Sequence, residues 1–175
     1  MYTVKELKGI GSFGAVLDVI DKKLMKRIAL KIIAHNSKFS NHKAIIREEA
    51  RVMQRINHEN IVKCYYFKEF LSYSLIAMSR CKISLRDYET ARRKQNNLIT
   101  EDEIATIMKS VCQGIKHMHD RQTIHRDLKP ANIMLKSKSD LSKVQIIDLG
   151  LALNLNVQQP CYENWGGTFA FMAPE

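Results

Sequence analysis

The sequence has no stretch that approaches 18 consecutive apolar residues, the length at which a membrane-spanning helix is predicted. Residues 1–8 contain no apolar core of the kind found in signal peptides. The four cysteines, at positions 64, 81, 112 and 161, form no C-x-x-C pair and do not resemble the framework of a disulfide-stapled scaffold. Internal repeats and low-complexity segments are also absent. These absences predict an intracellular, cytoplasmic protein with no membrane span.

What is present is the composition of a globular protein, with 45% hydrophobic and 26% charged residues among 175. A chain of this length buries roughly 70% of its unfolded surface when it folds. The net charge of +10 is compatible with nucleic-acid binding, but the basic residues are scattered over three separate groups, at 22–27, 92–94 and 136–143. Groups spaced in this way favour solvated loops, so we expect no nucleic-acid partner.

The first part of the chain has the pattern of a β-rich unit. Short alternating or compact apolar runs predict five strands, at 4–8, 15–20, 27–34, 61–70 and 72–78. Between the third and the fourth, residues 41–56 change to a helical period, whose inward stripe is Ile45, Glu49, Val52, Met53 and Ile56. A carboxylate on an inward face requires a partner, so Glu49 is expected to pair with a cation.

The second part is predicted to be mainly helical. Thr100 to Glu103 forms a capping box, and apolar residues continue at helical spacing to a helix end near His119. The polar stretch 86–97 precedes it, and short apolar pieces follow at 133–135 and 144–147, the second of which is expected to be a strand. A β-rich unit followed by a helical unit predicts the α+β class.

The segment 9–16 reads G-x-G-x-x-G-x-V, with glycines at Gly9, Gly11 and Gly14. The same spacing occurs in dinucleotide-binding folds, where the last glycine opens a helix, and in simple flexible hairpins. Here a strand pattern follows Gly14, which places the glycines in a turn between two strands. Backbone N–H groups in such a turn can approach phosphates closely.

Lys31 is a cation in the middle of the compact Ile/Leu/Ala run that is predicted as the strand 27–34. Alone, it reads as a lysine at a strand edge. Together with Glu49, it predicts an ion pair between the strand and the following helix, with a phosphate as the second partner of the lysine.

Three further motifs carry a family resemblance. Residues 125–132 read H-R-D-L-K-P-A-N, residues 148–150 read D-L-G, and residues 167–175 read G-T-F-A-F-M-A-P-E. Together with the glycine turn, they resemble the catalytic loop, the metal-binding element and the activation-segment end of eukaryotic protein kinases, serine/threonine type. The resemblance covers the chain from Val4 to Glu175, with Leu149 in the place of the usual phenylalanine.

The resemblance implies ATP and magnesium as cofactors and assigns site residues. Asp127 is the expected base, and Lys129 is similar to the lysine that serine/threonine kinases place against the transferring phosphate. Lys31, Glu49 and Thr168 complete the expected catalytic group, and Asn132 and Asp148 are the expected metal ligands. The expected nucleotide-binding residues are Gly9, Ile10, Gly11, Ser12, Phe13, Gly14, Val16, Ala29, Lys31, Met78, Ser79, Cys81 and Met134.

The family fold implies a five-stranded antiparallel N-lobe with one helix at 1–78, a hinge at 79–81 and an incomplete, mainly helical C-lobe at 82–175. The implied function is ATP- and magnesium-dependent transfer of phosphate to serine or threonine hydroxyls of a protein substrate. The alternative is a nucleotide-binding regulatory module, kinase-shaped but inactive because the C-lobe is incomplete. The sequence indicates no oligomeric state.

Overall fold

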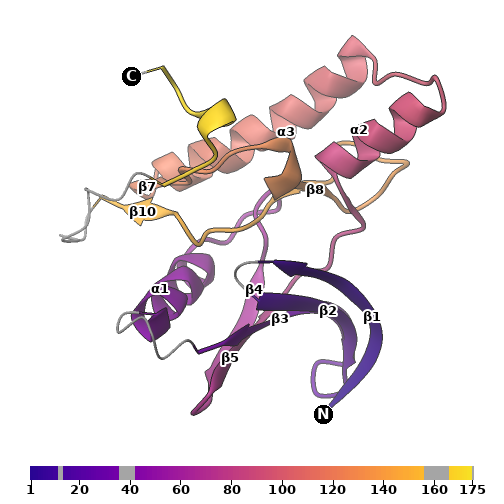
Figure 1. Ribbon diagram of the computed structural model, residues 1–175. Coiled ribbons are helices and arrows are strands. Elements are labelled where there is room, and N and C mark those ends of the chain that lie inside the picture. Colours follow the sequence, from indigo (N-terminus) through magenta and orange to yellow (C-terminus); the bar gives the residue numbers. More distant parts are fainter. Residues whose placement is uncertain (12–13, 36–41, 156–165, 175) are drawn as a thin grey trace. The chain divides into compact units, whose positions relative to one another are not determined.

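The structure, a computed structural model, describes residues 1–11, 14–35, 42–155 and 166–174 (Figure 1). The chain forms two compact units. The first unit consists of Met1–Arg55 and Lys63–Arg80, and the second unit consists of Ile56–Val62 and Cys81–Glu175. Residues 79–81, predicted as a hinge, lie where the chain leaves the first unit, and their function as a hinge stays a prediction.

The first unit is built around an antiparallel sheet whose spatial order is β1-β2-β3-β5-β4 (Figure 1). The strands are β1 (Tyr2–Gly11), β2 (Gly14–Asp21), β3 (Lys26–Ala34), β4 (Cys64–Glu69) and β5 (Tyr73–Met78). The five predicted strands and their antiparallel arrangement are confirmed. The fourth is shorter than predicted because Ile61 and Val62 belong to the second unit, where they pair with Ile146.

The sheet is curled, and one of its faces holds an apolar cluster. Its buried cluster consists of Val19, Ile28, Leu30, Leu75 and Ala77. Although β1 and β4 are the two outer strands, the hydroxyl oxygens of Tyr2 and Tyr66 are 2.6 Å apart. The curl therefore brings the two edges of the sheet together over the apolar cluster.

Helix α1 (His42–Arg55) lies beside the sheet and ends one residue before the predicted end. Its buried residues are Ile46, Glu49, Ala50, Val52 and Met53. The expected inward position of Ile45 is wrong: this side chain is exposed, and Ile46 lies on the buried face in its place. Both isoleucines lie within one turn of Glu49, so the sequence pattern alone did not fix which of them points inward.

The second unit contains helices α2 (Leu85–Lys94) and α3 (Glu101–His119) and two small sheets (Figure 1). The first sheet has the order β6 (Ile83–Ser84), β8 (Ile133–Leu135) and β9 (Val144–Ile146), and the second pairs β7 (Thr123–Ile124) with β10 (Leu153–Asn154). Two 3-10 helices, η1 (Pro130–Asn132) and η2 (Phe169–Phe171), complete it. The core consists of Tyr88, Ile107, Val111, Ile133, Leu135, Val144 and Ile146.

The capping box predicted at the start of α3 is confirmed. Thr100 Oγ1 accepts a hydrogen bond from Glu103 N at 3.3 Å, and the Glu103 carboxylate accepts one from Thr100 N at 2.9 Å. Helix α2 was not predicted. It begins after Ser84, whose hydroxyl caps Asp87 N, and it buries Tyr88 alone, so its sequence lacks the apolar stripe by which helices are recognised.

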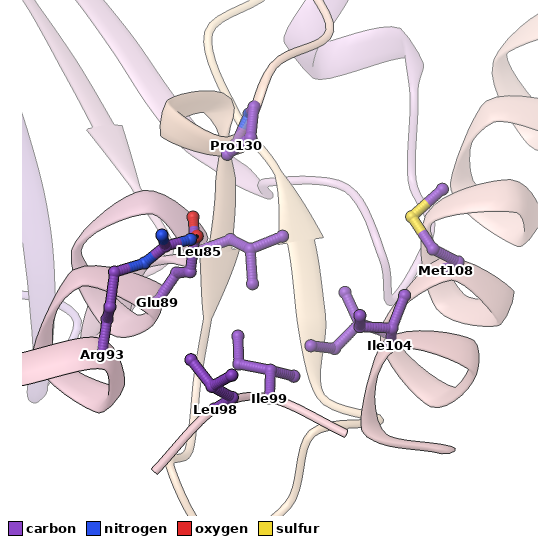
Figure 2. A pocket seen from close by; sticks show the side chains of 9 residues that line it. Leu85, Glu89, Arg93, Leu98, Ile99, Ile104, Met108 and Pro130 are labelled. Atoms are coloured by element: carbon purple, nitrogen blue, oxygen red, sulfur yellow. Dashed lines mark hydrogen bonds and ion pairs between the residues drawn. The ribbon is translucent and has the colours of Figure 1, made fainter. Parts of the chain in front are cut away.

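An open groove of about 400 Å³ lies between α2, α3 and the start of η1 (Figure 2). Ile104 and Met108 of α3 are exposed here, so part of the predicted apolar stripe of this helix lies uncovered in the second unit. No predicted site residue lines the groove, which is formed by Leu85, Glu89, Arg93, Leu98, Ile99, Ile104, Ile107, Met108 and Pro130.

Within the described ranges, no helix has both the length and the apolar character needed to cross a lipid bilayer.

Gly14 provides a test of the turn between β1 and β2. Its φ is +114°, and a Cβ atom at this position would lie 2.1 Å from the carbonyl oxygen of Ile32. We expect Gly14→Ala to lower the free energy of unfolding by about 1–3 kcal/mol, because the residue must leave a conformation that other residues rarely adopt.

Gly9 is the matched control, because a Cβ atom there would meet no atom within 4 Å. Gly9→Ala should change the free energy of unfolding by no more than about 0.5 kcal/mol. Urea denaturation of the two variants measures the difference, and equal losses would contradict the role given to the Gly14 backbone.

Candidate active site

In the first unit, the predicted ion pair between Lys31 and Glu49 is confirmed. Lys31 Nζ on β3 lies 2.7 Å from Glu49 Oε1 on α1, and both residues are buried. Lys31 is the single charged residue within the apolar stretch 28–34 of β3. The pair fixes the ammonium group at the face of the sheet that α1 covers.

Four predicted nucleotide-binding residues share that face. Val16 lies opposite Lys31 in the β2–β3 pairing, and Met78 lies opposite Ala29 in the β3–β5 pairing. Because directly opposed residues and residues two apart on one strand point to the same side, Val16, Ala29, Lys31 and Met78 form one surface. The fold therefore brings these predicted residues together.

The glycine turn lies at one end of this surface. Gly9, Ile10 and Gly11 are the last residues of β1, Gly14 begins β2, and the Ile10 side chain is exposed. Ser12 and Phe13, which the resemblance also assigns to the nucleotide, lie outside the described residues.

Ser79 immediately follows β5. Its N–H donates to the Lys63 carbonyl oxygen at 2.8 Å, and its hydroxyl accepts from Lys63 N at 3.1 Å. These two bonds anchor the end of β5 to the segment before β4.

In the second unit, the carboxylate of Asp127 is the centre of a polar cluster. Thr168 Oγ1 donates to Asp127 Oδ1 at 2.7 Å, and Asn132 Nδ2 donates to Asp127 Oδ2 at 2.9 Å. Lys129 Nζ lies 2.7 Å from Asp127 Oδ2 and also donates to Thr168 Oγ1, at 2.6 Å. Four predicted site residues thus converge.

The backbone around Asp127 is shaped to present this cluster. Asn132 Nδ2 also donates to the Asp127 carbonyl oxygen at 2.9 Å, which closes the loop. Arg126 has a φ of 69°, and Gly167 has a φ of 129° with no room for a Cβ atom against the Arg126 carbonyl oxygen, 2.7 Å away. A non-glycine residue at positive φ is strained, and such strain concentrates at functional sites.

The electrostatics of the cluster keep Asp127 ionised. Burial by itself raises the pKa of this carboxyl, but hydrogen bonds from Lys129 and Thr168, the charge of Lys129 and the bond from Asn132 outweigh it. The pKa of Asp127 therefore lies below its ordinary value, and the group is a carboxylate at neutral pH.

The two predicted metal ligands lie in neighbouring backbone segments. Ile147 N donates to the Asn132 carbonyl oxygen at 2.9 Å, which places Asp148 directly beyond a residue bonded to Asn132. The amide nitrogen of Asn132 is committed to Asp127, so its oxygen is the atom it can offer to a cation. Among the described residues, no group of three or more His, Cys, Asp and Glu side chains could hold a metal ion.

Two oxygen donors, one from Asn132 and one from Asp148, fit magnesium. This ion uses one or two protein oxygen ligands together with phosphate oxygens and water, rather than a cage made by the protein alone. Asn132 and Asp148 are therefore a compatible pair, and a tetrahedral zinc site is not what these residues provide.

His125 supports the cluster from inside the fold. Its Nδ1 accepts from Asp127 N at 3.2 Å, and its Nε2 faces the Ile147 carbonyl oxygen at 3.0 Å. Since an N–H only donates and a carbonyl only accepts, the ring is held as the neutral tautomer with its hydrogen on Nε2. Burial is the main cause that lowers the pKa of His125 below 6.5.

The stability should therefore depend on pH through His125. Because the pKa of the folded state is lowered, the unfolded chain binds the additional proton as the pH falls below about 6.5, and stability is lost. We expect the free energy of unfolding to fall between about pH 7.5 and about pH 5.5, and His125→Gln to flatten this dependence. Urea denaturation at a series of pH values measures this dependence, and an equal slope in His125→Gln and the unmodified chain would contradict the role given to His125.

The remaining predicted residues, Cys81 and Met134, lie in the second unit. Cys81 is buried, and its Sγ lies 3.4 Å from Gln145 Oε1, while Met134 is half-buried in β8. Gln145 was not predicted as part of the site. Its Nε2 donates to the carbonyl oxygens of Glu59 and Ile61, so it ties Cys81 to the Ile56–Val62 stretch. The sequence did contain one indication of this role, because Gln145 is the single polar residue inside the apolar run 144–147.

Comparison with known proteins places these features in a family. The chain matches the protein kinase domain over residues 2–175. It is 32% identical to myosin light chain kinase family member 4 of Mus musculus over 177 aligned residues, which cover 100% of this chain and 44% of that protein. It is 34% identical to the serine/threonine-protein kinase hippo of Drosophila melanogaster over 169 residues, 95% of this chain and 24% of that protein.

The chain thus spans less than half the length of these curated relatives. The match to the domain nevertheless extends over almost every residue, and it includes the glycine turn, the Lys31–Glu49 pair and the Asp127 cluster. The chain belongs to the protein kinase domain family.

Proposed function

We propose that this chain transfers the γ-phosphate of ATP, with magnesium, to serine or threonine hydroxyls of a protein substrate. The observation that carries the proposal is the Asp127 carboxylate, held by Thr168, Lys129 and Asn132 at once. A carboxylate whose oxygens are fixed in this way is oriented to receive a proton from a hydroxyl.

In the proposed reaction, the substrate oxygen forms a bond to the γ-phosphorus while the bond from phosphorus to the bridging oxygen of ADP breaks. The hydroxyl proton passes to Asp127. Lys129, whose Nζ contacts both the Asp127 carboxylate and the Thr168 hydroxyl, supplies positive charge next to the position of the transferring group. These residues act by positioning and by charge, which is the main demand of phosphoryl transfer.

The first unit is proposed to hold the nucleotide. Its glycine turn offers backbone N–H groups to phosphate oxygens, and Lys31, fixed by Glu49, offers a positive charge. Val16, Ala29 and Met78 provide an apolar surface beside that lysine, of the kind that accommodates a base.

Magnesium would be held by Asn132 and Asp148. When bound, the ion neutralises charge on the phosphates, and the proposal assigns it no other part. The preference for serine and threonine rests on Lys129 and Thr168, which resemble the residues of serine/threonine kinases at these positions, and it agrees with the printed name of the Drosophila relative. The same Asp127 cluster favours phosphoryl transfer over a role in nucleotide binding alone.

Calorimetric titration tests the nucleotide part of this proposal. We expect MgATP at about millimolar concentration, a level near physiological substrate concentrations, to raise the melting temperature and to release heat on binding. Asp148→Asn should weaken binding in the presence of magnesium more than in its absence. Folded protein that neither gains stability nor releases heat with MgATP would overturn the nucleotide assignment.

A further inference from the structure

A fully buried carboxylate lies on the same face of the sheet as the proposed base-binding surface. Asp18 is 0% exposed and is two residues beyond Val16 on β2. It lies opposite Ala29, which in turn lies opposite Met78, so the three residues form one cross-strand row over β2, β3 and β5. Burying an unpaired carboxylate is costly, so its partners are informative.

Asp18 has two arginine partners. Arg27 at the start of β3 donates from Nε to Oδ1 at 2.7 Å and from Nη2 to Oδ2 at 3.1 Å. This bidentate contact already engages both carboxylate oxygens. Arg80 adds a bond from its Nε to Oδ2 at 2.5 Å, across 62 residues of sequence. The Asp18 carboxylate therefore has a partner for both oxygens without Arg80, and the bond from Arg80 is a second one to Oδ2.

Arg80 lies just after β5, so its contact with Asp18 links the end of β5 to β2. Arg80 is the last residue of the first unit and follows Met78 and Ser79. β5 and β2 are not neighbours in the sheet, since β3 lies between them, and the Arg80 side chain bridges that strand. Ser79 is held to Lys63 on the other side. The segment after β5 is thus fixed from two directions.

We propose that Arg80, through Asp18, is a positioning residue of the nucleotide site, which sets the spacing between β2 and the segment after β5 and so determines how tightly the base is held. This inference rests on the proposed nucleotide-binding function. Neither residue contacts the phosphates in this account, because the glycine turn and Lys31 lie toward the other end of β2 and β3.

Arg27 and Arg80 contact the same carboxylate but connect it to different parts of the first unit, so their variants can be compared directly. The Arg27 side chain is 47% exposed and joins β3 to the neighbouring strand β2 through Asp18, whereas Arg80 is 27% exposed and connects Asp18 to the segment after β5. Removal of Arg80 leaves Asp18 with its bidentate partner, so Arg80→Met should fold. Removal of Arg27 takes away a partner of the same carboxylate and leaves residues 78–80 in place.

The experiment measures binding of two probes, MgATP and magnesium tripolyphosphate, to the whole chain. We expect Arg80→Met to weaken MgATP binding about tenfold, the effect of a small misplacement, and to leave tripolyphosphate binding unchanged. Arg27→Met should leave the affinity for both probes unchanged. Arg80→Lys, which retains a cation opposite Asp18, should recover most of the MgATP affinity.

The outcomes separate the two proposals. A wild-type chain that binds neither probe overturns the proposed function and this inference with it. A wild-type chain that binds MgATP, with Arg80→Met binding it equally well or losing both probes equally, overturns this inference alone. An Arg80→Lys variant as weak as Arg80→Met also overturns it, because the contact with Asp18 would then not be the cause.

Discussion

Asp127→Asn is expected to lower the rate of phosphoryl transfer by about 10²–10⁴-fold, the contribution typical of a positioned general base. Asparagine has nearly the same shape and retains an oxygen that can accept from Thr168. It lacks the negative charge that pairs with Lys129 and cannot accept the hydroxyl proton. The loss should fall on the chemical step, so the affinity for MgATP should change little.

Single-turnover kinetics separate binding from chemistry in this variant. Asp140→Asn is a suitable control, because Asp140 is a surface carboxylate that also pairs with a lysine, at 3.2 Å from Lys143 Nζ. Its transfer rate should equal that of the unmodified chain. A rate for Asp127→Asn within a factor of about two of the unmodified rate, where acid–base catalysis predicts at least a hundredfold loss, would remove Asp127 from the proposed mechanism.

Lys31→Met should have the largest effect on stability. The side chains of Lys31 and Glu49 are 11% and 6% exposed, so removing the lysine leaves a buried carboxylate without its ion-pair partner. Breaking a buried pair in this way costs about 3–5 kcal/mol, which lowers the melting temperature of a chain this long by roughly 6–20 °C. Phosphoryl transfer should also be lost, because Lys31 is the proposed phosphate contact.

A double variant distinguishes stability from function. Lys31→Met with Glu49→Leu replaces the pair by apolar groups and should recover most of the lost stability, while transfer stays absent. Arg47→Met is the control on the same helix. Arg47 pairs with Glu69 at 2.6 Å, but its side chain is 49% exposed, so its removal should leave the melting temperature nearly unchanged. Thermal denaturation and transfer assays on the same preparations measure both effects, and a double variant with normal transfer would contradict the role of Lys31.

Local patterns in the sequence predicted the frame of the molecule. The five strands could be predicted because each is a short alternating or apolar run next to turn residues, and the start of α3 because Thr100 and Glu103 are only three residues apart. Helix α2 could not, since it buries only Tyr88. The placement of Ile45 failed because neighbouring residues on a helix differ by about 100° and both are apolar.

Long-range polar contacts were the part of the site that the sequence did not reveal. Asp18 sits at a polar position of an alternating strand, which predicts exposure to solvent, and yet it is fully buried. Its partners are Arg27 on the neighbouring strand and Arg80, 62 residues away, and no local pattern encodes the second contact. Gln145 is similar, because its partner Cys81 is 64 residues away. The motif residues could be predicted because the family resemblance implies which residues, far apart in the sequence, lie together in the fold.

The most direct test of the central claim is incubation of the folded chain with magnesium, ATP labelled at the γ-phosphate and a protein rich in serine and threonine, followed by analysis of the labelled amino acids. The account predicts label on serine or threonine, dependent on magnesium and abolished in Asp127→Asn. A chain that binds MgATP but leaves the protein unlabelled, or that labels it equally well with Asp127→Asn, would contradict the proposed function.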